Sequence, residues 1–182
     1  PALSFSAGTD STAAAMVMPK NTILGYHRRT VESLLDHRNA QTLLTRLENE
    51  GRKTIDIASN HELIRTYHFK QIGFSTDFAC ATHLILLSDL YDIGAIAFGM
   101  PLDNTYLWKG RKYRDFKRID YFQYWSKRFK SVGIDLVLPI AGISEAGCMK
   151  ICHSNEIGQH LNSCMRGNGE TGCGKSTQSP CR

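Results

Sequence analysis

The sequence predicts an α/β fold in which a five-stranded parallel sheet carries helices on both of its faces. Three observations lead to this expectation. Short apolar runs alternate with longer segments of helical periodicity along the chain. Glycine follows several of the helical segments, where it readily ends a helix. Strands that alternate with helices are joined by right-handed crossovers, which make neighbouring strands parallel.

Hydrophobic periodicity places the elements in order along the chain. Strands are expected at residues 3–5, 22–26, 53–58, 95–99 and 135–140. Helices are expected at residues 13–18, 40–50, 62–68, 78–91 and 119–132, and two short helices follow the N-caps Ser144 and Ser154. Residues 78–91 are apolar nearly all round, so we expect this helix to be buried against the sheet and to end at Gly94. The apolar stripe of residues 119–132 is also expected in the core, with Gly133 ending the helix.

The composition is that of an ordinary globular protein. The chain has 182 residues, 42% of them hydrophobic, and a formal net charge of +5. We expect one main domain at residues 1–155 and a small cysteine-rich unit at residues 156–182. No run approaches the ~18 apolar residues of a membrane span, and the first residues lack the pattern of a signal peptide. We therefore expect a cytoplasmic protein without membrane contact, and a piece of a longer chain.

Residues 6–12 form the expected turn between the first strand and the first helix. The turn contains small residues and Gly8, and either Asp10 or Ser11 is expected to cap the helix. Such a turn aims backbone N–H groups and the positive end of the helix dipole at an anion. A phosphate is the natural ligand, and the alternative is a turn of the same shape that binds nothing.

Ligands of parallel α/β sheets bind at the carboxyl ends of the strands. Besides the opening turn, residues 27–29 follow the second expected strand, and residues 101–103 follow the fourth. We expect these segments to share one edge, where Arg28 offers a cation to phosphates. His27 would either move a proton there or serve the structure alone.

Residues 6–11, Ser-Ala-Gly-Thr-Asp-Ser, resemble the SGGxDS signature of the PP-loop ATP pyrophosphatases. The resemblance implies a Rossmann-like fold of the adenine nucleotide alpha hydrolase type, with ATP and Mg²⁺ as ligands. It implies catalytic roles for Asp10, Ser11 and Asp103, with Asp10 directed toward Mg²⁺ or a bridging water. The implied nucleotide-binding residues are Ser4, Phe5, Ser6, Ala7, Gly8, Thr9, Asp10, Ser11, Thr12, Tyr26, His27, Arg28 and Gly99. Ala7 stands where the family has a glycine, which narrows the conformational range of the loop.

Six cysteines provide a second signal, which is strongest near the C-terminus. Cys164, Cys173 and Cys181 lie in a glycine-rich stretch with few apolar residues. In a cytoplasmic protein such clusters favour zinc over disulfides, so we expect these three thiolates to hold a structural Zn²⁺. The fourth ligand is left open between a neighbouring helix with two cysteines and a histidine (Cys148, Cys152, His153) and a residue beyond Arg182. The alternative is a tail of free thiols.

The same tail contains a motif for a different kind of nucleotide site. Residues 169–176 fit the Walker A pattern GxxxxGK[ST] residue for residue. A Walker loop requires an apolar strand before it and a helix after it. Polar residues flank this segment on both sides, so we do not expect it to bind nucleotide.

The tail also resembles one branch of the PP-loop superfamily, the 7-cyano-7-deazaguanine synthases. The matching residues are Ser163-Cys164 and, eight residues later, Cys173-Gly174-Lys175, although Ser176 stands where the branch has a further cysteine. Thr82-His83 replaces an arginine-asparagine pair of that branch. The resemblance implies adenylation of a carboxylate substrate, such as a deazapurine, and transfer to ammonia or an amine. Relatives in bacterial antiviral defence systems use this activation on other acceptors.

Basic residues interleaved with aromatic residues fill one further segment, residues 106–118. This segment has little helical or strand periodicity and follows the fourth strand. We therefore expect it to be a mobile lid over the substrate. A nucleic acid is a less favoured partner than a small molecule. The segment nevertheless leaves a tRNA-modifying enzyme open as an alternative, beside an inactive nucleotide-binding module. A protein partner or acceptor and a homodimer also stay open.

Overall fold

The fold is described from a computed structural model of the chain. The structure describes residues 1–30, 38–70, 78–108, 111–157 and 161. The predicted cysteine-rich unit at residues 156–182 therefore lies almost entirely outside the described residues. The boundary predicted at residues 155 and 156 falls directly after the last described helix, Glu145–Ser154.

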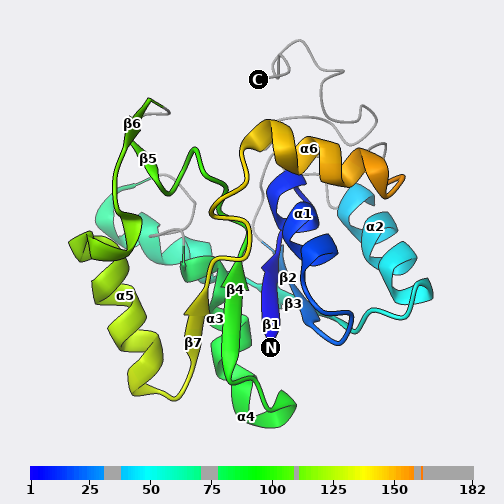
Figure 1. Cartoon of the computed structure of the whole chain (residues 1–182). Coiled ribbons are helices and arrows are strands. Elements are labelled where there is room, and N and C mark those ends of the chain that lie inside the picture. Colours follow the sequence, from blue (N-terminus) through cyan, green and yellow to red (C-terminus); the bar gives the residue numbers. More distant parts are fainter. Residues whose placement is uncertain (31–37, 71–77, 109–110, 158–160, 162–182) are drawn as a thin grey trace.

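A five-stranded, fully parallel sheet forms the centre of the protein, as the sequence predicts (Figure 1). Its strand order is β3-β2-β1-β4-β7. The strands are β1 Ala2–Phe5, β2 Ile23–Arg29, β3 Thr54–Ser59, β4 Ala95–Phe98 and β7 Asp135–Val137. The central position of β1 places the segment that follows it in the middle of the carboxyl edge.

Helices cover both faces of the sheet. On one face lie α1 Thr9–Val17, α2 Arg38–Asn49 and α6 Glu145–Ser154. On the other face lie η2 Ala79–Ala81, α3 Thr82–Leu86, α4 Ser88–Tyr91 and α5 Asp120–Ser131. The 3-10 helix η1 His61–His68 follows β3. Because alternate strand residues point to opposite faces, each face has its own apolar core.

The first layer is built from small and branched residues. Leu43, Leu44 and Leu47 of α2 are buried as their helical spacing predicts, and Gly51 with φ +85° follows the helix. The alanines at residues 13–15 of α1 are fully buried, which leaves room for α6 to pack directly across this helix. Cys148 and Cys152 fill that contact as buried thiols.

The expected long buried helix over residues 78–91 is wrong in three respects. The segment is divided into η2, α3 and α4, and the side chains of Leu86 and Leu90 are 79% and 74% exposed. The last turn ends at Asp92, which takes the left-handed conformation with φ +52°, and not at Gly94. The apolar composition of this segment predicted burial all round, but only one side of the broken helix is buried.

Helix α5 is also less buried than its stripe predicts. Of the stripe residues, Phe129 is buried, Phe122 and Trp125 are half-buried, and Val132 is exposed. The partner strand β7 is at the edge of the sheet, so it offers the helix little surface. Gly133 with φ +75° ends the helix as predicted.

Two expectations for the C-terminal helices have opposite outcomes. Ser144 caps α6, since its Oγ accepts a hydrogen bond from the Gly147 N–H at 3.2 Å. Ser154 caps nothing, because it is the last residue of the same helix. The expectation of two short helices with these two caps is therefore wrong at Ser154.

Residues 106–118, expected to lack regular structure, contain an antiparallel hairpin. Strands β5 Leu107–Trp108 and β6 Lys112–Tyr113 pair with each other, and η3 Phe116–Arg118 follows. The buried ring of Phe116 packs against Tyr106 and Phe122, which fastens the segment to α5. A function as a lid stays a prediction.

Among the described residues, no helix combines the length and the apolar character that crossing a membrane requires.

Candidate functional site

A closed arrangement of hydroxyl groups shapes the turn between β1 and α1. The Ser6 N–H donates to Ser11 Oγ at 3.2 Å, and the Ser6 and Ser11 Oγ atoms are 3.0 Å apart. Ser11 Oγ donates to the Gly8 carbonyl at 3.1 Å, and the Gly8 N–H donates to Ser6 Oγ at 3.4 Å. These bonds fix the turn before any ligand binds. A fixed, narrow turn before a helix is the geometry that the phosphate prediction requires.

Helix α1 begins earlier than the sequence predicts. Gly8 is the N-cap, and neither Asp10 nor Ser11 caps the helix, because both lie within its first turn. Ala7 takes φ +59°, a left-handed conformation that glycine adopts more easily. The alanine thus keeps the loop conformation that a glycine would permit.

Only some of the turn residues that are predicted to bind the nucleotide are exposed. Ser6 is exposed, while Gly8 and Asp10 are half-buried. Thr9 and Thr12 are buried, and Thr12 Oγ1 has no hydrogen-bond partner among the described residues. Thr12 was expected to contact phosphates, and that role stays a prediction, although its side chain is completely buried here.

Three carboxylates gather at this edge of the sheet. Burial, together with the nearby charges of Glu145 and Asp103, raises the pKa of Asp10 to about 6. Asp103 Oδ2 accepts a hydrogen bond from the Glu145 N–H at 2.9 Å, so the loop after β4 touches the first turn of α6. Glu145 was not among the predicted site residues. Its place directly after the predicted N-cap Ser144 was a signal that it lies in the first turn of a helix.

These carboxylates fit a divalent cation by their chemistry. Carboxylate oxygens are the ligands that Mg²⁺ prefers, and a cation would relieve the mutual repulsion that raises the pKa of Asp10. The described residues contain no group of three or more histidines, cysteines or acids already placed to hold a metal. The expectation that Asp10 and Asp103 would hold Mg²⁺ together with a bound phosphate group stays a prediction.

Gly99, expected to bind the nucleotide, has a packing role in the structure. A Cβ atom added at Gly99 would lie 2.7 Å from both Cα and N of Ser11 and 2.8 Å from the carbonyl carbon of Asp10. Only a residue without a side chain lets the end of β4 approach the first turn of α1 so closely. Gly99 thereby sets the position of Asp10 and Ser11.

The strand residues of the predicted site serve mostly the fold. Phe5 and Tyr26 are buried in the core, and Ser4 Oγ lies 3.2 Å from Cys80 Sγ. Arg28, expected to contact phosphates, donates from Nε to both carboxylate oxygens of Asp56 at 3.0 and 3.1 Å. The ion pair holds this guanidinium against β3.

Residues 27–29 were expected after β2, but they belong to it. The strand continues because β3 pairs with it as far as Ser59, beyond the end of β1. The His27 ring lies 5.3 Å from His83 and 5.9 Å from His61, in a histidine cluster that the sequence analysis missed. Burial, followed by the charge of His27, lowers the pKa of His83 to about 4, so His83 is neutral at physiological pH.

The predicted zinc ligands Cys164, Cys173 and Cys181 lie outside the described residues, as does the Walker-like segment 169–176. Three candidates for the fourth ligand, Cys148, Cys152 and His153, lie in the described helix α6. Burial raises the pKa of Cys148 to about 12 and that of Cys152 to about 11. Cys152 Sγ also donates to the Thr9 carbonyl at 3.5 Å. Both thiols are fully buried in the contact between α1 and α6, and a role as the fourth zinc ligand stays a prediction.

The raised pKa of Asp10 predicts a pH dependence of stability. The folded protein holds this proton more tightly than the unfolded chain, whose ordinary value is 3.8. The contribution of Asp10 to stability is therefore greatest below about pH 4 and is lost as the pH rises through about 6. Asp10→Asn removes this dependence. In thermal unfolding, the variant should gain on the wild type between about pH 4 and pH 8, and a constant difference would contradict the assignment.

Comparisons with known proteins support the fold. A model of a protein family described as a family of unknown function (DUF6395) matches residues 124–179. A search of curated proteins finds no match. Among solved structures, the chain is similar to the U34-tRNA thiolase NcsA from Methanococcus maripaludis with its 4Fe-4S cluster, at a TM-score of 0.59 and 15% sequence identity. The likeness covers 92% of this chain and 60% of that one, so this chain spans less than two thirds of the thiolase. The five-stranded Rossmann-like fold is thus one that this protein shares with the thiolase.

Proposed function

We propose that the protein is a PP-loop enzyme that binds ATP and Mg²⁺ at the turn between β1 and α1 and cleaves ATP between its α- and β-phosphates. The observation that carries the proposal is the hydrogen-bonded ring of Ser6, Gly8 and Ser11 at the start of α1, with Asp10 beside it. The residues of this ring are those that resemble the PP-loop signature. The fold supports the same assignment, because the turn follows the central strand at the ligand-binding edge.

The proposed reaction is activation of a carboxylate. A carboxylate oxygen of the substrate attacks the α-phosphorus, the bond to the bridging oxygen breaks, and pyrophosphate leaves into the turn. Ammonia or an amine then attacks the activated carbonyl and displaces AMP. The protein positions the reactants, and backbone N–H groups with Ser6 stabilise the charge that develops on the departing pyrophosphate. Bound Mg²⁺ would add positive charge beside Asp10.

The identity of the substrate rests on the resemblance of the tail to the deazaguanine synthases. We propose a small molecule with a carboxylate, such as a deazapurine, and we keep the antiviral defence relatives as a variant with a different acceptor. Neutral His83 stands in the pair that replaces the arginine-asparagine pair of that branch. A pocket built around it would select a substrate other than that of the deazaguanine synthases.

Modification of tRNA is the second candidate function. The observation that favours it is the fold shared with a tRNA thiolase. Measuring the product separates the two candidates. Amide formation from a carboxylate and ammonium supports the first, and ATP-dependent change of tRNA mass without any amide product supports the second.

The charge of Glu145 provides a test of the acidic group within the proposed reaction. Asp10 must be ionised to assist the phosphates, so pyrophosphate release should fall as the pH drops through about 6. Glu145→Gln removes a negative neighbour and should move the midpoint of this profile to lower pH. Pyrophosphate release at saturating ATP across the range from about pH 5 to pH 8 measures it. An unchanged midpoint would show that the charge of Glu145 does not affect the pKa of Asp10.

The zinc site of the tail is also proposed. Full-length protein should contain about one Zn²⁺ per chain by inductively coupled plasma spectrometry, because three thiolates at Cys164, Cys173 and Cys181 form most of a structural site. Cys164→Ser should lose the metal, while Cys80→Ser should keep it. Rapid reaction of all tail cysteines with a thiol probe, in protein without zinc, would contradict the site.

A further inference from the structure

We propose that the outer face formed by the β5–β6 hairpin and α5 binds single-stranded nucleic acid. We call this surface the hairpin–α5 face, and it consists of Trp108, Arg111, Lys112, Tyr113, Lys117, Tyr121, Tyr124, Lys127 and Arg128. Aromatic rings would stack on bases, while lysine and arginine would pair with phosphates. The proposal does not rest on the ATP chemistry at the opening turn.

The net positive charge of the chain is concentrated in this region. Residues 106–131 contain nine lysines and arginines but only two acids, so their net charge is +7. The whole chain carries +5, which leaves −2 for all other residues together. A polyanion would therefore be attracted to this part of the molecule and not to the surface as a whole.

Several of these cations have no ion-pair partner among the described residues. Arg118 pairs with Asp115 at 3.1 Å, and Lys130 pairs with Asp135 at 3.2 Å. The exposed cations Arg111, Lys112, Lys117 and Lys127 form no ion pair with any residue that the structure describes. Their charges are available to phosphates without first breaking an internal ion pair.

Exposed aromatic rings lie among these cations. Trp108 is 53% exposed, Tyr113 70% and Tyr124 49%. The guanidinium of Arg128 lies 3.8 Å from the centre of the Tyr124 ring, and that of Arg114 lies 5.6 Å from the Trp108 ring. Rings and guanidinium groups together offer flat surfaces on which unpaired bases stack.

The packing of the hairpin holds this face in place. Arg114 donates from Nε to the Thr105 carbonyl at 2.6 Å and from Nη2 to the Asn104 carbonyl at 3.0 Å. The ring of Phe116 lies 6.4 Å from Tyr106 and 5.4 Å from Phe122, which connects the hairpin to α5. The surface therefore exists before any ligand binds, and little ordering is needed on binding.

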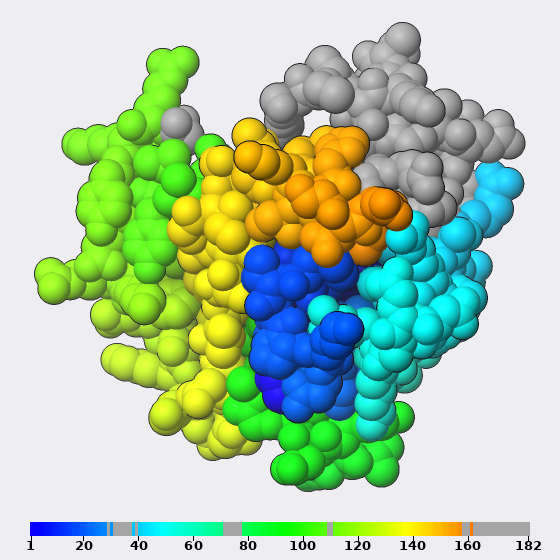
Figure 2. Space-filling view, turned by 45° about the vertical axis from the view of Figure 1, so that its right-hand side comes forward, coloured from blue at the N-terminus to red at the C-terminus, as the bar shows by residue number. Residues whose placement is uncertain are grey.

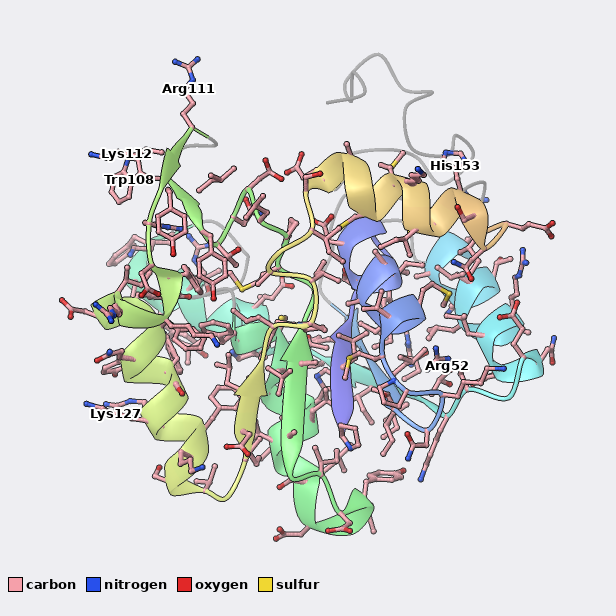
Figure 3. The ribbon with its side chains drawn as sticks, viewed as in Figure 1. Arg52, Trp108, Arg111, Lys112, Lys127 and His153 are labelled. Atoms are coloured by element: carbon pink, nitrogen blue, oxygen red, sulfur yellow. The ribbon has the colours of Figure 1, made fainter. Side chains whose placement is uncertain are left out.

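The pictures show that the two parts of the face lie on the same side of the molecule. Trp108, Arg111 and Lys112 project from the end of the hairpin, and Lys127 projects outward from α5 on that side (Figure 3). The hairpin stands apart from α6, with a notch between them in the space-filling view (Figure 2). A strand lying along this face would reach from α5 to the carboxyl edge of the sheet.

A single strand fits the face better than an acidic peptide does. An acidic peptide would use the cations but would leave the aromatic rings in water. A single-stranded nucleic acid offers phosphates and unpaired bases in alternation, so both kinds of side chain are engaged. RNA and DNA share this chemistry, and the experiment below distinguishes them.

Fluorescence anisotropy with labelled 20-nucleotide uridine RNA and thymidine DNA tests the charges of the face. Lys112→Glu combined with Lys127→Glu should weaken binding about tenfold or more at about 100 mM salt and reduce the salt dependence. Lys20→Glu combined with Lys53→Glu changes the net charge equally at exposed positions outside the face, and this variant should weaken binding much less. Tighter binding of one oligonucleotide shows whether the face prefers RNA or DNA. Equal binding of the two shows that it binds single strands of either kind.

Replacing Trp108 tests the stacking component. Trp108→Ala should weaken single-strand binding about tenfold, whereas Trp108→Phe keeps a ring and should restore most of the affinity. Thermal unfolding should be unchanged in both variants, because Trp108 is exposed. If Lys112→Glu with Lys127→Glu lost no more binding than Lys20→Glu with Lys53→Glu, the proposal would be overturned. Equally strong competition by polyglutamate of matched charge would also overturn it, in favour of an acidic protein partner.

Discussion

Asp10→Ala is expected to lower ATP-dependent pyrophosphate release by about 100-fold or more, while the protein stays folded. The carboxylate lies in the first turn of α1, beside the ring formed by Ser6 and Ser11, where negative phosphate oxygens and Mg²⁺ would meet. Its removal would take away one of the two carboxylates proposed to hold Mg²⁺. The measurement uses ATP, Mg²⁺, ammonium and a deazapurine carboxylate, and pyrophosphate is detected by an enzyme-coupled assay.

Two control variants make this result specific. Asp89→Ala removes an exposed acid of α4 and should leave the rate unchanged. Lys175→Ala alters the Walker-like segment and should also leave it unchanged. A normal rate in Asp10→Ala with a large loss in Lys175→Ala would move the nucleotide site to the tail and contradict the account.

Gly99→Ala is expected to produce the second largest effect, by displacing the opening turn. The new methyl group would lie 2.7 Å from backbone atoms of Ser11, so either β4 or α1 has to shift. Overpacking of this kind costs about 1–3 kcal/mol of folding free energy, and the shift should also weaken ATP binding about tenfold. Denaturant unfolding and calorimetric titration with MgATP measure the two effects.

Gly142→Ala is the matched control for this substitution. A Cβ atom at Gly142 meets nothing within 4 Å, so this variant should keep both stability and ATP affinity. If Gly99→Ala behaved like Gly142→Ala, the close approach of β4 to the turn would not set the position of Asp10 and Ser11.

The sequence was sufficient to predict the fold because the sheet depends on patterns within single segments. Alternation of apolar runs and helices predicted five parallel strands, and the leucine spacing of α2 predicted its buried face. The helix end at Gly133 followed from local turn chemistry. Burial of residues 78–91 could not be predicted in this way, since it depends on which neighbours cover Leu86 and Leu90.

The candidate site was predictable where it is local and not where it depends on distant contacts. Ser6, Asp10 and Ser11 lie within one turn, and their spacing alone indicated an anion site. Asp103 and Glu145 are in contact although they lie 42 positions apart in the sequence. Gly99 and Ser11, which are also in contact, lie even further apart in the sequence. Arg28 was assigned to phosphates from its place near the end of β2, and the sequence does not reveal that it pairs with Asp56 on a neighbouring strand.

Hydrogen exchange with and without MgATP tests most directly whether the opening turn is the nucleotide site, and it requires no knowledge of the second substrate. The account predicts that MgATP slows exchange of the backbone amides at residues 6–12, with little change at residues 169–176. Slower exchange at residues 169–176 with no change at residues 6–12 would contradict it.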